Sequence, residues 1–210
     1  MLPILRLGVI AASFFSLASL IVLVLRTFVW GRRRPYSEPK GKAFLGVLYA
    51  LGKGLMPWEK ESTSKNLLTY AAGNLYHIGI FAGLMHLSLQ VISWEVGALL
   101  VSCLRIFMVC GLAAGSGLLL RRTLKTVLRE ISCPDDFASN ILVDLFLAAA
   151  LLDSFFPGIK PVFYALSIAL FLYIPIGKIR HCFFFFYSRI LFGLFFGKRS
   201  VLPQSQRILK

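Results

Sequence analysis

The sequence predicts an all-α membrane protein with five transmembrane helices, the N-terminus outside and the C-terminus in the cytoplasm. Three observations support this prediction: the composition, the spacing of charged residues and the distribution of lysine and arginine. The chain has 210 residues, of which 58% are hydrophobic and 15% are charged, and its mean hydropathy is +0.77. A soluble domain of this length cannot bury so much apolar surface.

Three long stretches with few or no charged residues are each long enough for one membrane span. Residues 7–25 form a stretch of 19 without charge, residues 66–94 one of 29, and residues 96–120 one of 25 that contains only Arg105. An α-helix rises about 1.5 Å per residue, so each stretch can cross about 30 Å of hydrocarbon. These stretches are the first three predicted spans.

Two shorter apolar runs complete the predicted count. Residues 137–152 and 161–177 both extend into neighbouring apolar residues. Residues 182–210 are rich in aromatic and basic side chains but lack an uninterrupted length for a sixth span. We therefore predict a five-helix membrane domain over residues 1–181 and, over 182–210, an interfacial tail on the cytoplasmic side or a surface covered by a partner subunit.

The basic residues predict the orientation. With the N-terminus outside, 20 of the 23 lysines and arginines fall on the inner side, and Arg6, Arg105 and Lys160 are the exceptions. The run Gly31–Arg34 acts as a cytoplasmic stop, so the first apolar run is a span and not a cleaved signal peptide. The net charge of +14 indicates topology and contact with lipid headgroups, not binding of nucleic acid.

Two inner connections have features of their own. Within the connection 31–66, residues 43–56 carry an apolar stripe at helical spacing, which predicts a helix along the inner membrane surface. That helix is either an interfacial linker or a docking surface for a partner. Asp135 and Asp136 lie at the predicted start of the fourth span, where they either cap the helix or have a functional role, in which they contact a partner protein or bind a proton.

The chain has three histidines, and two of them are candidate ligands of one haem b. An imidazole inside hydrocarbon is costly without a partner, so intramembrane histidines are functional candidates. His77 and His181 lie in the inner halves of two predicted spans, where they could bind one iron from two sides. His86 is nine residues after His77, about 13 Å further along the helix and on its opposite side, so these two cannot share a haem. His86 is left to bond a quinone or a backbone carbonyl.

Other intramembrane and juxtamembrane charges have two possible roles each. Arg105 either pairs with Glu95 or Asp153 or donates to a quinone carbonyl. Asp144, midway along the fourth span, either accepts a proton or bonds a Ser or Asn side chain. The four cysteines form no CxxC or CxxCH motif, so covalent haem attachment and an iron–sulfur cluster held by this chain alone are not expected. Four basic residues near the predicted haem could bind its propionates: Arg121, Arg122, Lys178 and Arg180.

Three segments resemble the gamma subunit of respiratory nitrate reductase. They are Asn74–Ile80 around His77, Gly117–Arg122, and Leu170–His181, and the similarity extends over about residues 65–181. Related membrane subunits accompany heterodisulfide-reductase-like and sulfite-reduction-associated complexes. The resemblance implies five helices with the N-terminus outside and two b haems, the inner one bound by His77 and His181.

The same resemblance places the ligands of the outer haem at Leu87 and Phe163, neither of which can bind iron. An outer haem would therefore need a one-residue shift that makes His86 a ligand, together with a second ligand other than histidine. We therefore expect one inner haem b in a cytochrome b membrane-anchor subunit. Such a subunit, not catalytic alone, would carry electrons between the quinone pool and a cytoplasmic iron–sulfur partner in a prokaryotic inner membrane. The alternative is a haem-free anchor that docks a soluble redox complex.

Overall fold

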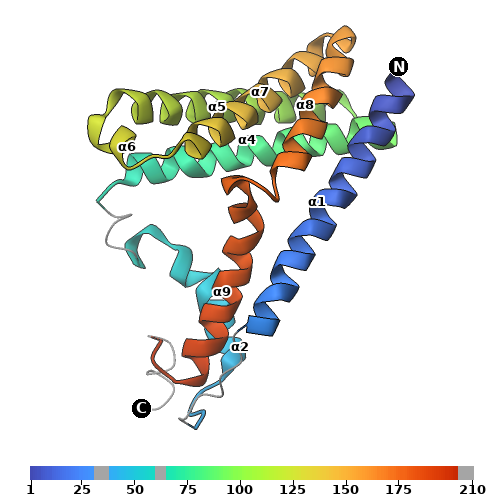
Figure 1. Cartoon of the computed structure of the whole chain (residues 1–210). Helices are drawn as coiled ribbons and strands as arrows, with labels where there is room; N and C mark the ends of the chain where they lie inside the picture. The colour runs from blue at the N-terminus through green and yellow to red at the C-terminus, as the bar shows by residue number, and fades with distance from the viewer. Residues whose placement is uncertain (31–37, 60–64, 203–210) are drawn as a thin grey trace. The chain divides into compact units, whose positions relative to one another are not determined.

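The computed structural model describes residues 1–30, 38–59 and 65–202 (Figure 1). Within these residues the regular structure is helical throughout. The helices are α1 (Leu2–Trp30), α2 (Ala43–Leu51), α4 (Leu67–Ile92), α5 (Ala98–Leu124), α6 (Thr126–Glu130), α7 (Pro134–Phe155), α8 (Lys160–Tyr173) and α9 (His181–Lys198). Short 3₁₀ turns cover Lys53–Leu55, Pro57–Glu59, Pro157–Ile159 and Lys178–Arg180. The predicted stop at Gly31–Arg34 lies outside the described residues.

Among the described residues, five helices are long and apolar enough to cross a membrane, as predicted in number. Four of them, α1, α4, α5 and α7, correspond to predicted spans. The fifth is the segment Lys178–Lys198, which contains α9, whereas the predicted fifth span forms the 14-residue α8. The chain is therefore a multi-pass membrane protein whose fifth candidate span is not the predicted one.

The difference at the fifth span has a physical reason at each helix. Pro175 cannot donate a backbone hydrogen bond and disfavours helix before it, so α8 ends at Tyr173. The tail seemed too short because Arg189 interrupts its apolar run. In the structure the Arg189 guanidinium lies 5.5 Å from the centroid of the ring of Phe185, a residue one helical turn before it. Helix α9 continues beyond Arg189 to Lys198. The prediction that the tail is too short for a span was therefore wrong.

The chain forms two compact units. The first comprises Met1–Leu20 and Leu68–Ile179, and the second comprises Ile21–Leu67 and Arg180–Lys210. In the first unit α7 packs against α5 and α8. Its fully buried core side chains come from α5, α7 and α8: Met108, Phe146, Leu147 and Phe163.

Glycines allow two helices of the first unit to approach closely. A Cβ atom at Gly79 of α4 would lie 2.5 Å from the Cα atom of Gly111 of α5. Small residues at helix crossings are the usual means of close packing within a membrane. The buried residues of α4 recur every three or four positions and so form one face: Gly79, Ala82, Gly83, His86 and Leu87. This face directs His86 into the bundle.

One of the two aspartates at the start of α7 caps the helix. The Cys133 backbone N–H donates to Asp136 Oδ2 at 2.9 Å. Asp135 accepts from the Lys178 backbone N–H at 2.9 Å and from the Tyr173 hydroxyl. Capping, one of the two roles predicted for these aspartates, is confirmed for Asp136, whereas Asp135 bonds residues at and after the end of α8. The pair also ties the start of α7 to the end of α8.

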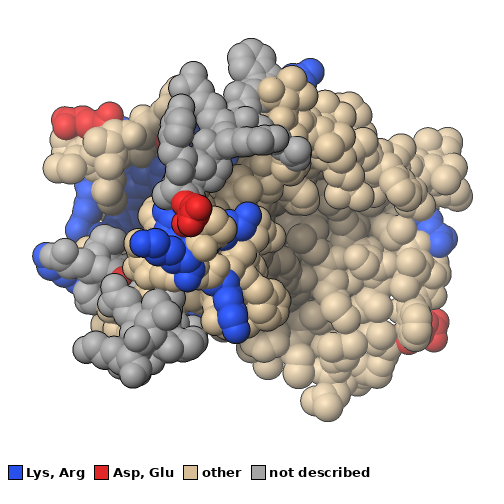
Figure 2. Space-filling model, turned by 90° about the horizontal axis from the view of Figure 1, so that it is seen from below, with Lys and Arg blue, Asp and Glu red and all other residues tan. Residues whose placement is uncertain are grey.

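The second unit brings α2 against α9. A Cβ atom at Gly46 of α2 would clash with the carbonyl oxygen of Gly193 and lie 2.6 Å from the Cα atom of Gly197. The backbone N–H groups of Lys40 and Gly41 each donate to the Lys198 carbonyl at 2.9 Å. The predicted helix at 43–56 thus forms α2, and its buried face covers α9. Several Lys and Arg side chains are visible in the view from below (Figure 2).

Aromatic residues complete the second unit. The hydroxyls of Thr27, near the end of α1, and Tyr187 of α9 are hydrogen-bonded, and the Phe28 and Tyr187 rings lie 6.3 Å apart. The Tyr49 hydroxyl donates to Glu59 Oε2 at 3.0 Å. Burial and this carboxylate raise the pKa of Tyr49. Segments far apart in the sequence therefore form one body.

The substitution Gly46→Ala should destabilise the second unit, because its methyl group meets backbone atoms of α9 that cannot rotate away. We expect a loss of about 1–3 kcal/mol. Gly117→Ala is the control, because a Cβ atom at this position has no neighbour within 4 Å. This substitution should stabilise the helix by up to about 1 kcal/mol, since Ala has a higher helix propensity than Gly. Unfolding in mixed micelles of rising SDS content measures both. Equal midpoints for the two variants would contradict the close α2–α9 crossing.

Candidate functional site

A cavity of about 1030 Å³ lies within the first unit. Its walls come from the start of α1, the end of α4, the start of α5, the end of α7 and the start of α8. About half of its lining residues are apolar, including Leu7, Ile10 and Leu104. The polar and charged residues on its wall are Arg6, His86, Gln90, Ser93, Glu95, Asp153, Ser154, Lys160 and Tyr164. Its volume and mixed lining are typical of a small-molecule site.

A buried His–Asp pair lies on the cavity wall. His86 Nε2 is 2.9 Å from Asp153 Oδ2, and the two side chains are 8% and 0% exposed. The Phe163 ring packs beside the imidazole with its centroid 5.6 Å away. The sequence predicted a quinone or a backbone carbonyl for His86, and the structure gives it a carboxylate. Asp153 was predicted as a partner of Arg105 and instead bonds His86.

The pair sets the chemistry of the imidazole. An ionised carboxylate only accepts hydrogen bonds, so Nε2 of His86 is the donor when Asp153 is ionised. The lone pair of a neutral imidazole is then on Nδ1, which can accept a proton. The other carboxylate oxygen, Asp153 Oδ1, is buried and has no hydrogen-bond partner among the described residues. Taken together, the two groups can hold and exchange a proton in an apolar setting.

Four further polar residues, Arg6, Gln90, Lys160 and Tyr164, lie on the same cavity wall. Tyr164 of α8 is 3% exposed and interacts electrostatically with Asp153 and with Arg6 of α1. Lys160 Nζ donates to Gln90 Oε1 at 2.7 Å. Four helices, α1, α4, α7 and α8, therefore contribute polar groups to one cavity. Sequence reasoning missed Arg6 and Tyr164. The signal that could have found the site was the presence of two ionisable residues, His86 within the second predicted span and Asp153 directly after the fourth.

Arg105 has partners beside the cavity wall. Its Nε donates to Ser154 Oγ at 3.1 Å, and its Nη2 donates to the Ser154 carbonyl. The guanidinium carbon lies 3.9 Å from the centroid of the Phe155 ring. These contacts hold Arg105 at the end of α7. They replace the predicted ion pair with Glu95 or Asp153.

His77 has a geometry suited to an axial haem ligand. Its Nδ1 lies 2.6 Å from the Gly73 carbonyl oxygen, and its side chain is exposed on α4. A carbonyl oxygen only accepts, so Nδ1 carries the proton and the lone pair of the neutral ring is on Nε2. His181 is exposed at the first position of α9. His77 belongs to the first unit and His181 to the second.

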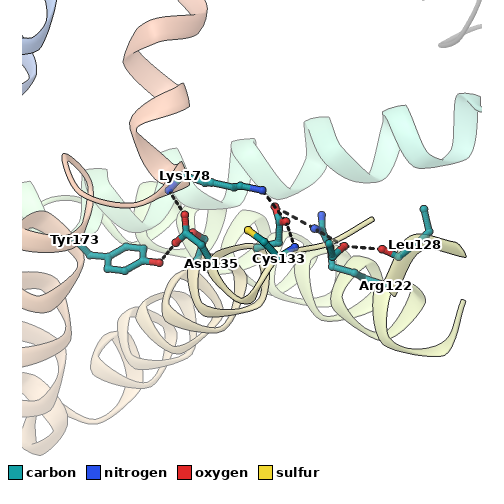
Figure 3. Close-up of polar contacts among 9 residues, drawn as sticks. Arg122, Leu128, Cys133, Asp135, Tyr173 and Lys178 are labelled. Carbon is teal, nitrogen blue, oxygen red and sulfur yellow. Dashed lines mark hydrogen bonds and ion pairs between the residues drawn. The ribbon is translucent and has the colours of Figure 1, made fainter. Parts of the chain in front are cut away.

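The predicted propionate ligands have protein partners. Arg122 Nη1 lies 3.2 Å from Asp136 Oδ1, and Lys178 Nζ lies 2.7 Å from Asp136 Oδ2 (Figure 3). The structure thus brings Arg122 and Lys178 together around one carboxylate. Arg121 donates to the Thr69 hydroxyl. Arg180 ends the 3₁₀ turn before α9, in the second unit.

No protein-family model, curated protein or solved structure matches this chain. The described residues contain no group of three or more His, Cys, Asp or Glu side chains that could hold a metal ion. The functional candidates are therefore the cavity with its His86–Asp153 pair and the separate histidines His77 and His181.

Proposed function

We propose that the chain is the membrane-anchor subunit of a quinone-linked redox complex and that its cavity binds the quinone headgroup. The observation that carries the proposal is the buried His86–Asp153 pair on the wall of a partly apolar cavity of about 1030 Å³. A quinone needs an apolar surface for its ring and tail, and it needs polar groups that hold its oxygens and exchange protons. The cavity supplies both.

The pair supplies the proton chemistry of the proposed site. Oxidation of a quinol releases two protons and two electrons. Nδ1 of His86 accepts the proton of one quinol hydroxyl, while Asp153 holds Nε2–H and stabilises the imidazolium that forms. The Glu95 carboxylate, also on the cavity wall, accepts the proton of the other hydroxyl. Tyr164 and Arg6 are positioned by α8 and α1 to hold the second oxygen. Arg105, bonded to Ser154 next to Asp153, supports this end of α7.

The electron carrier in this proposal is one haem b bound by His77 and His181. Two observations support it: the resemblance to the gamma subunit of nitrate reductase and the Nδ1–H bond of His77 to Gly73, which orients the ring as the hydrogen bond on the other ring nitrogen does for a metal-ligating histidine. A haem held by these two residues would supply one-electron redox chemistry between the quinol and the next carrier. The recipient is an iron–sulfur partner on the cytoplasmic side of a prokaryotic inner membrane.

The cavity lies beside a position where the resemblance places a ligand of the outer haem. The two positions where the resemblance calls for iron ligands are Leu87 and Phe163, which are 3% and 0% exposed. Phe163 packs on His86, so an apolar ring stands beside the cavity at one of the positions predicted for an outer haem ligand. A quinone site next to these residues gives the outer half of the unit a role without a second haem.

One observation favours a second candidate, a haem-free anchor that docks a soluble redox complex. Asp136 already pairs with Arg122 and Lys178, two of the residues predicted to bind the propionates. A haem would have to share these cations with Asp136. Reduced-minus-oxidised spectra of the purified protein distinguish the candidates, because b-type bands occur only with haem.

Quinone binding should weaken when the His–Asp pair is removed. Trp94 lies on the cavity wall, so quenching of its fluorescence by short-chain ubiquinone and menaquinone analogues measures the dissociation constant. The double variant His86→Leu/Asp153→Asn removes the hydrogen-bonding imidazole without leaving a buried charge. Loss of one hydrogen bond of about 1.4 kcal/mol raises Kd about tenfold.

The control for this titration is His77→Leu, a histidine of the same helix that is not on the cavity wall. It should bind both analogues with the wild-type Kd. Identical Kd values for the double variant and the control would refute the assignment of the quinone to the cavity.

Haem binding should depend on His77 and His181 and not on His86. Each of the variants His77→Ala and His181→Ala should lose the b-type absorption bands, because one imidazole is too weak an anchor for the iron. His86→Ala should keep them, since its side chain bonds Asp153 in the cavity. The haem content per chain of the purified proteins provides the measurement. A loss confined to His86→Ala would reverse the assignment.

A further inference from the structure

A second carboxylate, Asp144, lies within α7 and away from the cavity wall. Asn140, one turn earlier, donates from Nδ2 to Asp144 Oδ2 at 3.0 Å. Asp144 Oδ1 is buried and has no hydrogen-bond partner among the described residues. A Cβ atom at Gly115 of α5 would clash with this oxygen and with the Tyr76 ring of α4. Three helices thus enclose the carboxyl group.

The groups around Asp144 do not compensate a negative charge. The side chains that interact with it are Tyr76 from α4 and Asn140 from α7, and α5 presents Gly115. Tyr76 is the titratable member, and its hydroxyl is engaged with Asn140 at 3.2–3.3 Å. A buried carboxylate oxygen without a donor is costly in a low dielectric, so the neutral acid is the favoured form.

We propose that Asp144 is an intramembrane proton-binding site that holds its proton at neutral pH and is loaded from the α6 side of the bundle. The step is the protonation of a carboxylate to the carboxylic acid, with one proton taken up and no other bond changed. The Asp144 site is separate from the quinone cavity, so this proposal does not depend on the proposed function.

Polar side chains mark the route to Asp144. Asp136, Asn140 and Asp144 follow one another at intervals of four residues, so they lie on one face of α7 about 6 Å apart. Asp136 is at the helix start, next to Arg122 and Lys178, and it keeps its charge through these pairs. On the other side of Asp144, α7 presents three side chains that are 0% exposed: Phe146, Leu147 and Ala150. This apolar layer separates Asp144 from the cavity.

Infrared spectra of the full chain in lipid vesicles test whether Asp144 is protonated. Asp144→Asn is neutral and nearly identical in shape, so it keeps the contact with Asn140. It should lose one carbonyl-stretching band of a protonated carboxylic acid relative to the wild type at neutral pH. Asp136→Asn is the matched control on the same face of α7 and should lose none, because Asp136 is ionised. Unchanged acid bands in Asp144→Asn would overturn the proposal.

Transfer of the vesicles into D₂O tests from which side the proton reaches Asp144. Exchange of the acid proton for deuterium shifts the carbonyl-stretching band of Asp144, so the rate of this shift reports the access of water. Asn140→Leu, of similar size, should slow the shift of the Asp144 band, and Asp153→Asn should leave its rate unchanged. Slower exchange in Asp153→Asn with a normal rate in Asn140→Leu would place the route on the cavity side and refute loading from the α6 side.

Discussion

Polar side chains inside a bilayer must find their partners within the protein, because hydrocarbon offers no hydrogen bonds. In the first unit α7 meets this constraint three times. Asp153 bonds His86 of α4, Ser154 bonds Arg105 of α5, and Asp144 bonds Asn140 one turn earlier. α7 also packs against both α5 and α8. The positions of the other helices, and of the cavity between them, therefore depend on the polar contacts of α7.

The two ends of α7 differ in chemistry. At its start, the Asp136 carboxylate caps the helix and pairs with Arg122 and Lys178, so the charge there is compensated and structural. At its end, the carboxylate of Asp153 is fully buried, faces an imidazole and adjoins a cavity. Compensated charge is suited to holding helices in place. A buried acid–base pair is suited to exchanging protons with a ligand, which is why the quinone is assigned to this end.

Much of the fold could be predicted from hydropathy, because apolar runs bounded by charges reflect the thickness of the bilayer. The exception was the fifth span. In the sequence Arg189 interrupts the apolar run after His181, which made this segment look too short for a span, whereas in the helix its guanidinium lies over the Phe185 ring. At the site, the intramembrane position of His86 was evident from the sequence, but its partner was not. The partner is 67 residues away on another helix, and the faces of α4 and α7 that meet depend on glycines and crossings that a sequence pattern does not specify.

In the proposed function a quinol bound at the cavity delivers electrons to a haem in the same chain. Adding a short-chain quinol to the oxidised, purified protein and recording the visible spectrum tests this transfer. We predict reduced b-type bands in the wild type. In His86→Leu/Asp153→Asn the quinol should produce no such bands, while dithionite still does. Equal reduction of both proteins by quinol, or no b-type bands with dithionite in the wild type, would contradict the account.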